Sequence, residues 1–210
     1  MTIGQRRAWE RSWQRWGADV IDLPEGALDM TRWFGRAAPT VLEIGSGMGE
    51  STASMALAAP EVDHLAVEVY QPGLAQLLSR IEQAQITNLR LLRGDAYALL
   101  HDHIAVGSLD GVRIYFPDPW PKRRHHKRRL VNPEFVTLVA SRLAPGGLLH
   151  LATDWEPYAQ EMLAACTTEP TLRNTAAEFA TRPLWRPVTK FEQRARDDGR
   201  VVRDLLFTRC

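Results

Sequence analysis

A proline-rich acidic loop followed by a dense basic run stands near the middle of the chain, at residues 116–129. The loop reads FPDPWP, and the eight residues after it, Lys122–Arg129, comprise six Lys or Arg and two His. Each of Phe116, Asp118 and Trp120 precedes a proline, which disfavours the α region and predicts extended backbone at all three. The pattern is typical of one rigidly held carboxylate beside a binding surface for a polyanion such as nucleic acid.

A second group of residues, LEIGSGMGE at 42–50, has the composition of a ligand-binding turn between a strand and a helix. Gly45, Gly47 and Gly49 permit a tight turn and close approach of a ligand to the backbone. A pyrophosphate is disfavoured, because the spacing departs from the dinucleotide fingerprint, Glu opens the helix and no Gly-Lys-Ser/Thr follows. Glu43 adds another negative charge. The turn therefore suits a cationic ligand without phosphate, and S-adenosylmethionine has that chemistry.

Two further acids end the next two predicted strands. Glu68 lies 19 residues after Gly49, where such folds place the acid that accepts hydrogen bonds from the ribose. A carboxylate only accepts hydrogen bonds, so its two oxygens match a vicinal diol. Asp95, in RGDA, can accept from an adenine amino group. Either acid alone could be a solvated strand end or a helix cap, but together with the glycines they indicate a nucleoside site.

The elements that must position these residues alternate along the chain. Apolar runs predict strands at 40–44, 64–69, 89–94, 111–116 and 148–153. Helical spacing follows most of them, which predicts a mostly parallel α/β sheet with helices on both faces. Residues 188–209 read as two extended segments around Asp197-Asp198-Gly199, a hairpin that would add antiparallel edge strands.

Trp9, Trp13 and Trp16 share one face of a predicted amphipathic helix over residues 5–16, and arginines occupy another face. We interpret it as a helix docked on the core through its tryptophans. Contact of its arginines with phosphate is a compatible alternative.

The composition limits the class of protein. The 210 residues, 45% hydrophobic and 24% charged, suffice for one globular domain with a sizeable core. The net charge of +1 conceals the local basic segments. Two cysteines are too few for a disulfide framework, and no apolar run suits a membrane span or a signal peptide. We therefore expect a cytoplasmic protein that does not associate with membranes.

Three longer segments, FPDPWPKRRHHKRRLV, HLATDWEPYA and RPVTKFEQR, resemble the bacterial tRNA (guanine-N7)-methyltransferases, in this order behind LEIGSGMG and VEVYQPG. The resemblance covers about residues 40–209. It implies a Rossmann-like class I methyltransferase fold, with a mostly parallel seven-stranded sheet and an antiparallel edge hairpin. We accordingly divide the chain into a basic, Trp-rich helical extension, residues 1–36, and an S-adenosylmethionine-dependent methyltransferase domain, residues 37–210.

The resemblance also implies the reaction and the residues that perform it. A methyl group would pass from S-adenosylmethionine to N7 of guanine 46 in the variable loop of tRNA, leaving S-adenosylhomocysteine. Glu43, Glu68 and Asp95 would bind the cofactor with the three glycines, and Asp118 would border both cofactor and guanine as the catalytic residue. Further contacts with the nucleotide or the RNA would come from Lys122, Arg124, His125, His126, Lys127, Arg128, Arg129, Asp154, Thr189, Lys190, Phe191 and Glu192. No metal and no obligatory protein partner are implied.

The chemistry of guanine agrees with these residue types. N7 carries a lone pair and no proton, so its attack on a sulfonium methyl requires alignment rather than a base. A fixed carboxylate stabilises the positive charge that develops on the purine, and this favours an electrostatic and orienting role for Asp118. Asp154 and Glu192 are further acceptors for the guanine N1–H and N2–H₂ donors, although Asp154 could instead cap the helix that begins near Glu156.

Two other functions remain open at this point. A methyltransferase that modifies the amino group of adenine would carry a Pro-Pro-aromatic loop where this chain has Asp-Pro-Trp. A non-enzymatic RNA-binding module is the third possibility, but such a module has no reason to keep four acids at the ends of successive strands.

Overall fold

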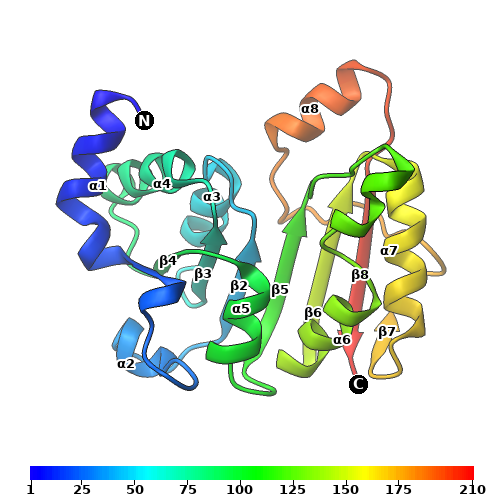
Figure 1. Cartoon of the computed structure of the whole chain (residues 1–210), viewed down its shortest axis with the longest axis horizontal. Coiled ribbons are helices and arrows are strands. Elements are labelled where there is room, and N and C mark those ends of the chain that lie inside the picture. The colour runs from blue at the N-terminus through cyan, green and yellow to red at the C-terminus, as the bar shows by residue number, and fades with distance from the viewer. The chain divides into compact units, whose positions relative to one another are not determined.

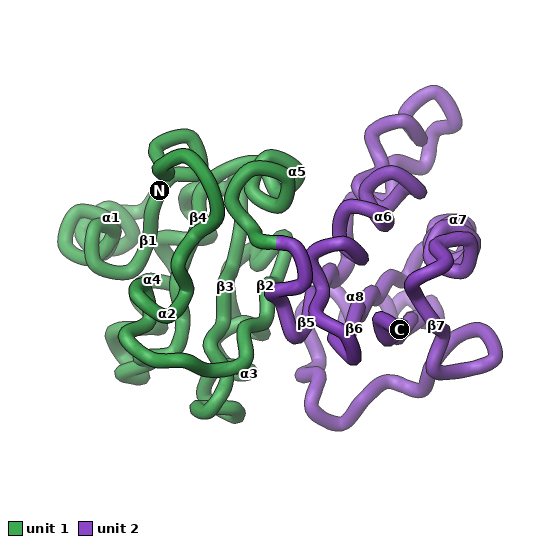
Figure 2. The backbone as a smooth tube through the Cα atoms, turned by 90° about the horizontal axis from the view of Figure 1, so that it is seen from below, with its two compact units in different colours: residues 1–105 green, residues 106–210 purple.

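The apolar runs between glycine-rich turns become parallel strands in the computed structural model, which describes all residues 1–210. The chain divides into two compact units, Met1–Ala105 and Val106–Cys210 (Figure 2). Each unit contributes four strands, so the chain has eight strands where seven were expected. Helices surround the strands of each unit (Figure 1).

The first unit is built on a parallel sheet with the strand order β1-β4-β3-β2. The strands are β1 (Gly17–Asp19), β2 (Thr40–Ile44), β3 (Asp63–Glu68) and β4 (Leu89–Arg93). The helices are α1 (Ile3–Trp16), η1 (Val20–Asp22), α2 (Met30–Phe34), α3 (Glu50–Ala58), α4 (Gln71–Ala84), α5 (Ala96–Ala98) and η2 (Leu99–His103). In this parallel arrangement the turns that follow β2, β3 and β4 lie at one edge of the unit, which brings the glycine turn, Glu68 and Asp95 to the same side.

The N-terminal helix α1 is docked, as its tryptophans predict. Its capping box joins Thr2 and Gln5. Trp9, Trp13 and Trp16 are partly buried and pack against the core cluster formed with α4 and the central strands. On the same helix, Arg11 forms an ion pair with Glu82 of α4.

The second unit carries a mixed sheet with the strand order β5-β6-β8-β7. Its strands are β5 (Leu109–Tyr115), β6 (Leu143–Thr153), β7 (Leu172–Asn174) and β8 (Arg203–Arg209), and its helices are η3 (Arg123–Arg128), α6 (Pro133–Arg142), α7 (Glu156–Thr168) and α8 (Lys190–Asp197). β5 and β6 are parallel, whereas β8 is antiparallel to both β6 and β7. Antiparallel strands at the edge were therefore predicted correctly.

The predicted hairpin around Asp197-Asp198-Gly199 was wrong. Its second arm is β8, but its first arm is the helix α8, so β8 pairs with β6 and β7 instead. The side chain of Thr189 accepts a hydrogen bond from the backbone N–H of Glu192 at 3.0 Å and caps the first turn of this helix.

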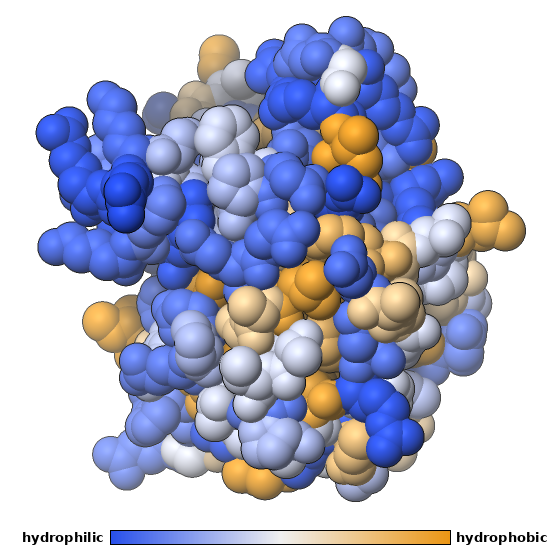
Figure 3. All heavy atoms as spheres, turned by 90° about the vertical axis from the view of Figure 1, so that its right-hand side faces the viewer, coloured by the Kyte–Doolittle hydropathy of each residue, from blue (hydrophilic) through white to orange (hydrophobic).

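Figure 3 shows one face on which hydrophilic side chains predominate, with apolar groups gathered near its centre. No helix combines the length and the apolar composition that crossing a membrane requires. Both cysteines are free, and burial raises the pKa of the Cys166 thiol to about 12.

Candidate active site

The glycine turn between β2 and α3 adopts the conformation that its composition predicts. Gly45, Gly47 and Gly49 have φ values of 80°, 54° and 71°, in the left-handed region that favours glycine. A Cβ on Gly49 would lie 2.6 Å from the side chain of Leu77, whereas Gly45 and Gly47 face open space. The turn therefore leaves room for a ligand at its first two glycines and packs tightly against α4 at its third.

Glu68 at the end of β3 organises this turn. One carboxylate oxygen accepts a hydrogen bond from the Gly47 N–H at 2.8 Å. The other oxygen accepts from the N–H groups of Val69 and Tyr70 at 2.7 and 2.9 Å. Glu68 therefore fixes the glycine turn, and its predicted contact with a ribose stays a prediction.

Gly73 is a residue of this site that we did not single out beforehand, although it closes the VEVYQPG segment. A Cβ on Gly73 would lie 2.1 Å from the carbonyl oxygen of Gly47. Only glycine lets α4 approach the turn this closely. The glycine that follows Pro72 at the start of a predicted helix is the signal that could have revealed it.

Asp95 follows β4 and caps the short helix α5, where its Oδ1 accepts a hydrogen bond from the Ala98 N–H at 2.9 Å. The helix-cap alternative is thus realised for one carboxylate oxygen, and this fixes the orientation of the side chain. Glu43 is buried on β2, with 6% of its surface exposed.

A cavity of about 970 Å³ opens beside the ends of β3 and β4. Val69, Gly94, Asp95 and Ala98 line one side of it, and residues 19–26 line the other. A volume in the range of 300–1,000 Å³ is typical of small-molecule sites. The cavity is therefore a candidate for the part of the site that takes the base of a nucleoside.

The Asp118 loop follows β5 in the second unit and differs from the prediction in its backbone. Phe116 and Trp120 have φ values of 52° and 43° rather than the extended values expected before proline. Bulky residues rarely adopt positive φ, and such strained positions concentrate where the surrounding structure holds a site. Asp118 lies between these two residues and is exposed.

The basic segment after this loop forms η3 (Arg123–Arg128) instead of an irregular tail. The guanidinium of Arg128 lies over the ring of Trp120 at 4.9 Å, and the ring of His125 meets the same indole edge-on at 5.8 Å. Lys122, Arg124 and Lys127 are exposed, and His126 is half-buried. The segment therefore presents a cluster of cations next to an aromatic side chain.

Arg129 is the exception in this segment, because its side chain is only 2% exposed. It donates a hydrogen bond to the Pro119 carbonyl at 2.8 Å, forms an ion pair with Glu161 at 2.5 Å and lies over the ring of Tyr158. We had expected Arg129 to contact RNA, but a guanidinium with these buried contacts is not available to bind a phosphate. We reassign Arg129 to holding the Asp118 loop against α7.

Asp154 follows β6, and the alternative that it caps α7 does not hold. The cap position of α7 is Trp155, and the Trp155 N–H donates to the hydroxyl of Thr153. Asp154 instead forms an ion pair with Arg200, which also pairs with Asp198 at 2.8 Å. The carboxylate is thus oriented, and it keeps part of its surface exposed.

The predicted substrate residues on helix α8 differ in how far they are exposed. Phe191 is 62% exposed, and its ring centroid lies 6.1 Å from that of Phe116. Lys190 is also exposed, whereas Glu192 is 1% exposed and pairs with Arg186 at 2.6 Å. The carboxylate of Glu192 is therefore held by arginine in this structure, and its contact with guanine stays a prediction.

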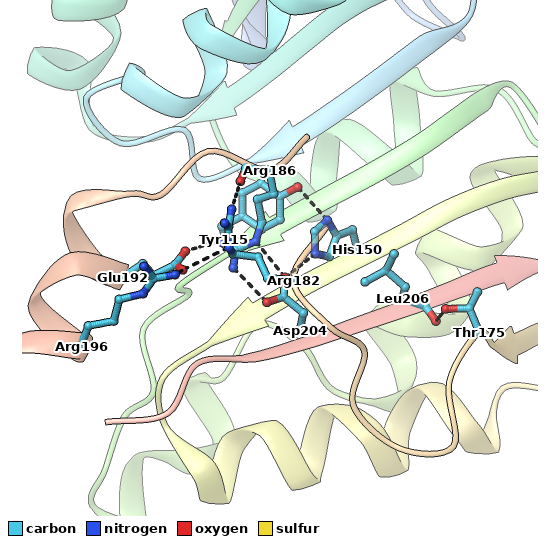
Figure 4. Close-up of polar contacts among 9 residues, drawn as sticks. All are labelled: Tyr115, His150, Thr175, Arg182, Arg186, Glu192, Arg196, Asp204 and Leu206. Carbon is cyan, nitrogen blue, oxygen red and sulfur yellow. Dashed lines mark hydrogen bonds and ion pairs between the residues drawn. The ribbon is translucent and has the colours of Figure 1, made fainter. Parts of the chain in front are cut away.

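A buried polar network that the sequence did not suggest connects α8 to the sheet (Figure 4). Arg186 donates to Asp204 on β8 at 2.8 and 2.9 Å. Asp204 also lies 2.7 Å from Nε2 of His150 on β6, and Nδ1 of His150 lies 2.9 Å from the Tyr115 hydroxyl on β5. Burial lowers the pKa of His150 despite the nearby carboxylate. A neutral His150 donates to Asp204 and accepts from Tyr115, which satisfies every group in the chain of contacts.

This network makes stability depend on pH. The pKa of His150 is lower in the folded chain than the usual value of about 6.5, so between these two pKa values the unfolded chain binds a proton that the folded chain does not. We expect the free energy of unfolding to fall by up to about 1.4 kcal/mol per pH unit as the pH drops from 6.5 toward the folded pKa. Urea unfolding at pH 7.5, 6.5 and 5.5 measures this, and a His150→Gln variant should give a flatter profile. Equal slopes in the two proteins would contradict the assignment.

The known proteins that this chain resembles in sequence belong to one family. The sequence profile of a family described as "Putative methyltransferase" matches residues 37–205. A tRNA (guanine-N(7)-)-methyltransferase of Streptomyces avermitilis is 52% identical over 211 residues, covering 100% of this chain and 72% of that protein. One of Bordetella pertussis is 54% identical over 210 residues, covering 100% of this chain and 82% of that protein. The chain belongs to the tRNA (guanine-N7)-methyltransferase family.

Solved structures show the same fold at low sequence identity. The 16S rRNA methyltransferase KamB superposes with a TM-score of 0.63 at 15% identity, covering 89% of this chain and 99% of that one. TrmN from Thermus thermophilus gives 0.59 at 18% identity, with 86% of this chain and 47% of that chain covered. The fold is accordingly the Rossmann-like fold of class I methyltransferases, as the resemblance implied.

Proposed function

We propose that this chain transfers a methyl group from S-adenosylmethionine to N7 of guanine 46 in the variable loop of tRNA, and releases S-adenosylhomocysteine. The observation that carries the proposal is the identity of 50% or more, over the whole of this chain, to proteins named tRNA (guanine-N(7)-)-methyltransferase. Residues 37–210 act as the methyltransferase domain, and residues 1–36 as an extension to it. The reaction belongs in the cytoplasm with its tRNA substrate and requires neither a metal nor a second protein.

The first unit has the features that a phosphate-free, cationic nucleoside needs. Glu50 at the start of α3 disfavours a phosphate there and pairs with Arg80 at 2.8 Å. Gly45 and Gly47 leave open space for a ligand, and Glu68 presents acceptors for a ribose. Bound S-adenosylmethionine supplies an electrophilic methyl group on its sulfonium. Glu43, Glu68 and Asp95 are the residues that we propose to hold it, with Asp95 receiving the adenine amino group.

Residues of the second unit are the ones that we propose to act on the purine and the tRNA. Asp118 stabilises the positive charge that develops on the purine as N7 forms its new bond, and no proton has to be removed in that step. Because the loop is held by its prolines and by Arg129, the carboxylate requires little reorganisation during the reaction. Asp154 and Lys122 contact the nucleotide, and the exposed cations of η3 contact phosphates of the tRNA.

The experiment that tests the proposal is labelled methyl transfer to unmodified tRNA transcripts. Aniline-induced cleavage after borohydride treatment locates any N7-methylguanosine, and we expect one cleavage site in the variable loop. A transcript with adenosine in place of that guanosine is the matched control. Methylated adenosine in the digested product, or no transfer despite cofactor binding, would contradict the proposed reaction.

The exposed cations of the basic segment predict a salt effect on RNA binding. Replacing Lys127 and Arg128 by Gln should weaken tRNA binding and reduce the log–log salt slope by roughly 0.7–0.9 per lost phosphate contact. Filter binding between low and moderate salt measures this. Arg129→Gln is the matched comparison from the same segment, because Arg129 is buried. It should lower the melting temperature and leave the slope unchanged, and a slope reduction of roughly 0.7–0.9 for Arg129→Gln would contradict our reassignment.

A further inference from the structure

We propose that Arg186 is a positioning residue that fixes α8 and thereby holds the substrate side of the Asp118 loop in its reactive arrangement. The inference rests on the proposed function, because it concerns the same methyl-transfer site. Glu192 is the residue of α8 that Arg186 holds.

Arg186 is the largest fully buried side chain of the protein, with 0% of its surface exposed. Its guanidinium joins two carboxylates on different elements, Asp204 of β8 at 2.8 and 2.9 Å and Glu192 of α8 at 2.6 Å. Breaking such a buried arrangement leaves a charge without its partner in a medium of low polarity, which is strongly unfavourable. The planar fork of the guanidinium also fixes direction, so Arg186 sets both the distance and the orientation of α8 relative to β8.

Helix α8 has few other attachments. Glu192 and Ala195 are the buried residues among its eight, so apolar packing cannot position it alone. Arg182 and Arg196 also approach Glu192, but they are 30% and 49% exposed and therefore form the rim of the network. The buried contact with Arg186 is thus the one that determines where α8 lies.

The network ends at the loop that carries Asp118. Arg186 lies 5.7 Å from the ring of Tyr115, the last residue of β5, and Tyr115 is joined to Asp204 through His150 (Figure 4). Phe116 follows directly and stacks on Phe191 of α8. One buried cation therefore ties both the helix and the base of the loop to the same sheet.

The test compares Arg186→Met with Arg173→Met, which removes an exposed arginine from β7 in the same unit. For Arg186→Met we expect kcat to fall at least thirtyfold, while the dissociation constants for S-adenosylmethionine and tRNA change less than threefold. Trypsin should cleave at Lys190, Arg194 or Arg196 at least tenfold faster, because α8 is released. Arg173→Met should match the wild type in all four measurements. Unchanged kcat, or a parallel loss of cofactor binding, would overturn the proposal.

A second variant separates positioning from stability. Arg186→Lys keeps a positive charge beside Asp204 and Glu192 but lacks the planar fork that fixes their direction. We expect a melting temperature closer to that of the wild type than that of Arg186→Met, with kcat still reduced, and wild-type kcat in this variant would show that the fork does not position α8. The rate of trypsin cleavage is measured without tRNA, so it does not depend on the proposed methyl transfer. If the wild type itself methylated no tRNA, the proposed function would fail, and accelerated cleavage of Arg186→Met would still establish that Arg186 holds α8.

Discussion

Replacing Asp118 by alanine is expected to lower the rate of methyl transfer about a thousandfold and to leave tRNA binding nearly unchanged. The carboxylate is exposed, so its loss leaves no buried cavity and should not unfold the loop. The loop keeps its hydrogen bond from Arg129, and the cations of η3 remain in place. Removing one preorganised electrostatic group typically costs about 10²–10³ in kcat. Single-turnover methyl transfer and filter binding with the same tRNA measure the two effects.

The control for this variant is Asp110→Ala, which removes an exposed carboxylate from the other end of the same strand. It should retain wild-type rates. Asp118→Asn tests the role further, because an amide cannot stabilise developing positive charge as a carboxylate does but has a similar shape. We expect Asp118→Asn to transfer methyl groups nearly as slowly as Asp118→Ala. If Asp118 acted as a general base, raising the pH would restore part of the lost rate, and we expect no such recovery. Equal losses of rate and tRNA affinity in Asp118→Ala would contradict the assigned role.

The sequence was informative about the first unit because its signals are local. Glycines with positive φ, an acid at a strand end and an apolar run each depend on a few neighbouring residues. β2 was therefore predicted with the observed bounds, and Glu68 was predicted correctly to lie at the end of a strand. β1 was missed because it has three residues and no alternation. It exists through pairing with β4, where Asp19 also forms an ion pair with Arg93.

The second unit was harder to predict because the burial of its charged residues depends on contacts between residues far apart in the sequence. The capping signature Thr189-x-x-Glu192 precedes a run of good helix formers, and it could have indicated α8. The buried state of Glu192, in contrast, depends on Arg186, whose own burial depends on Asp204 far along the chain. Arg186, between Trp185 and Pro187, carries no local sign of such a partner, since charged side chains are usually exposed.

The pre-proline positions of the Asp118 loop show how tertiary structure overrides a local preference. The rule that the residue before proline avoids the α region did not lead to extended backbone at Phe116 or Trp120. Phe116 donates its backbone N–H to Ala152 at 2.7 Å and stacks on Phe191, and Trp120 lies against Arg128. These contacts hold both residues at positive φ, and the carboxylate of Asp118 lies between two points that the surrounding structure fixes.

The second large effect is expected from Glu68→Ala, which should weaken binding of S-adenosylmethionine at least a hundredfold. The carboxylate holds the Gly47, Val69 and Tyr70 N–H groups, so its loss frees the glycine turn. It also removes the acceptors proposed for the ribose, and hydrogen bonds to charged groups contribute about 1.5–3 kcal/mol each. Two such bonds amount to about 3 kcal/mol or more, and each 1.4 kcal/mol corresponds to a factor of ten in affinity. Isothermal titration calorimetry measures the dissociation constant directly.

Two comparisons show which part of that loss is specific. Glu61→Ala removes an exposed acid shortly before the same strand and should leave cofactor affinity unchanged. Glu68→Gln keeps one oxygen acceptor, so it should bind the cofactor with intermediate affinity, because one set of hydrogen bonds persists while the charge is lost. A dissociation constant for Glu68→Ala within threefold of the wild type would mean that the turn is organised without this carboxylate and that the ribose is held elsewhere. Since the three N–H groups converge on Glu68 alone, we expect the cofactor site to depend on it more than on any other acid of the first unit.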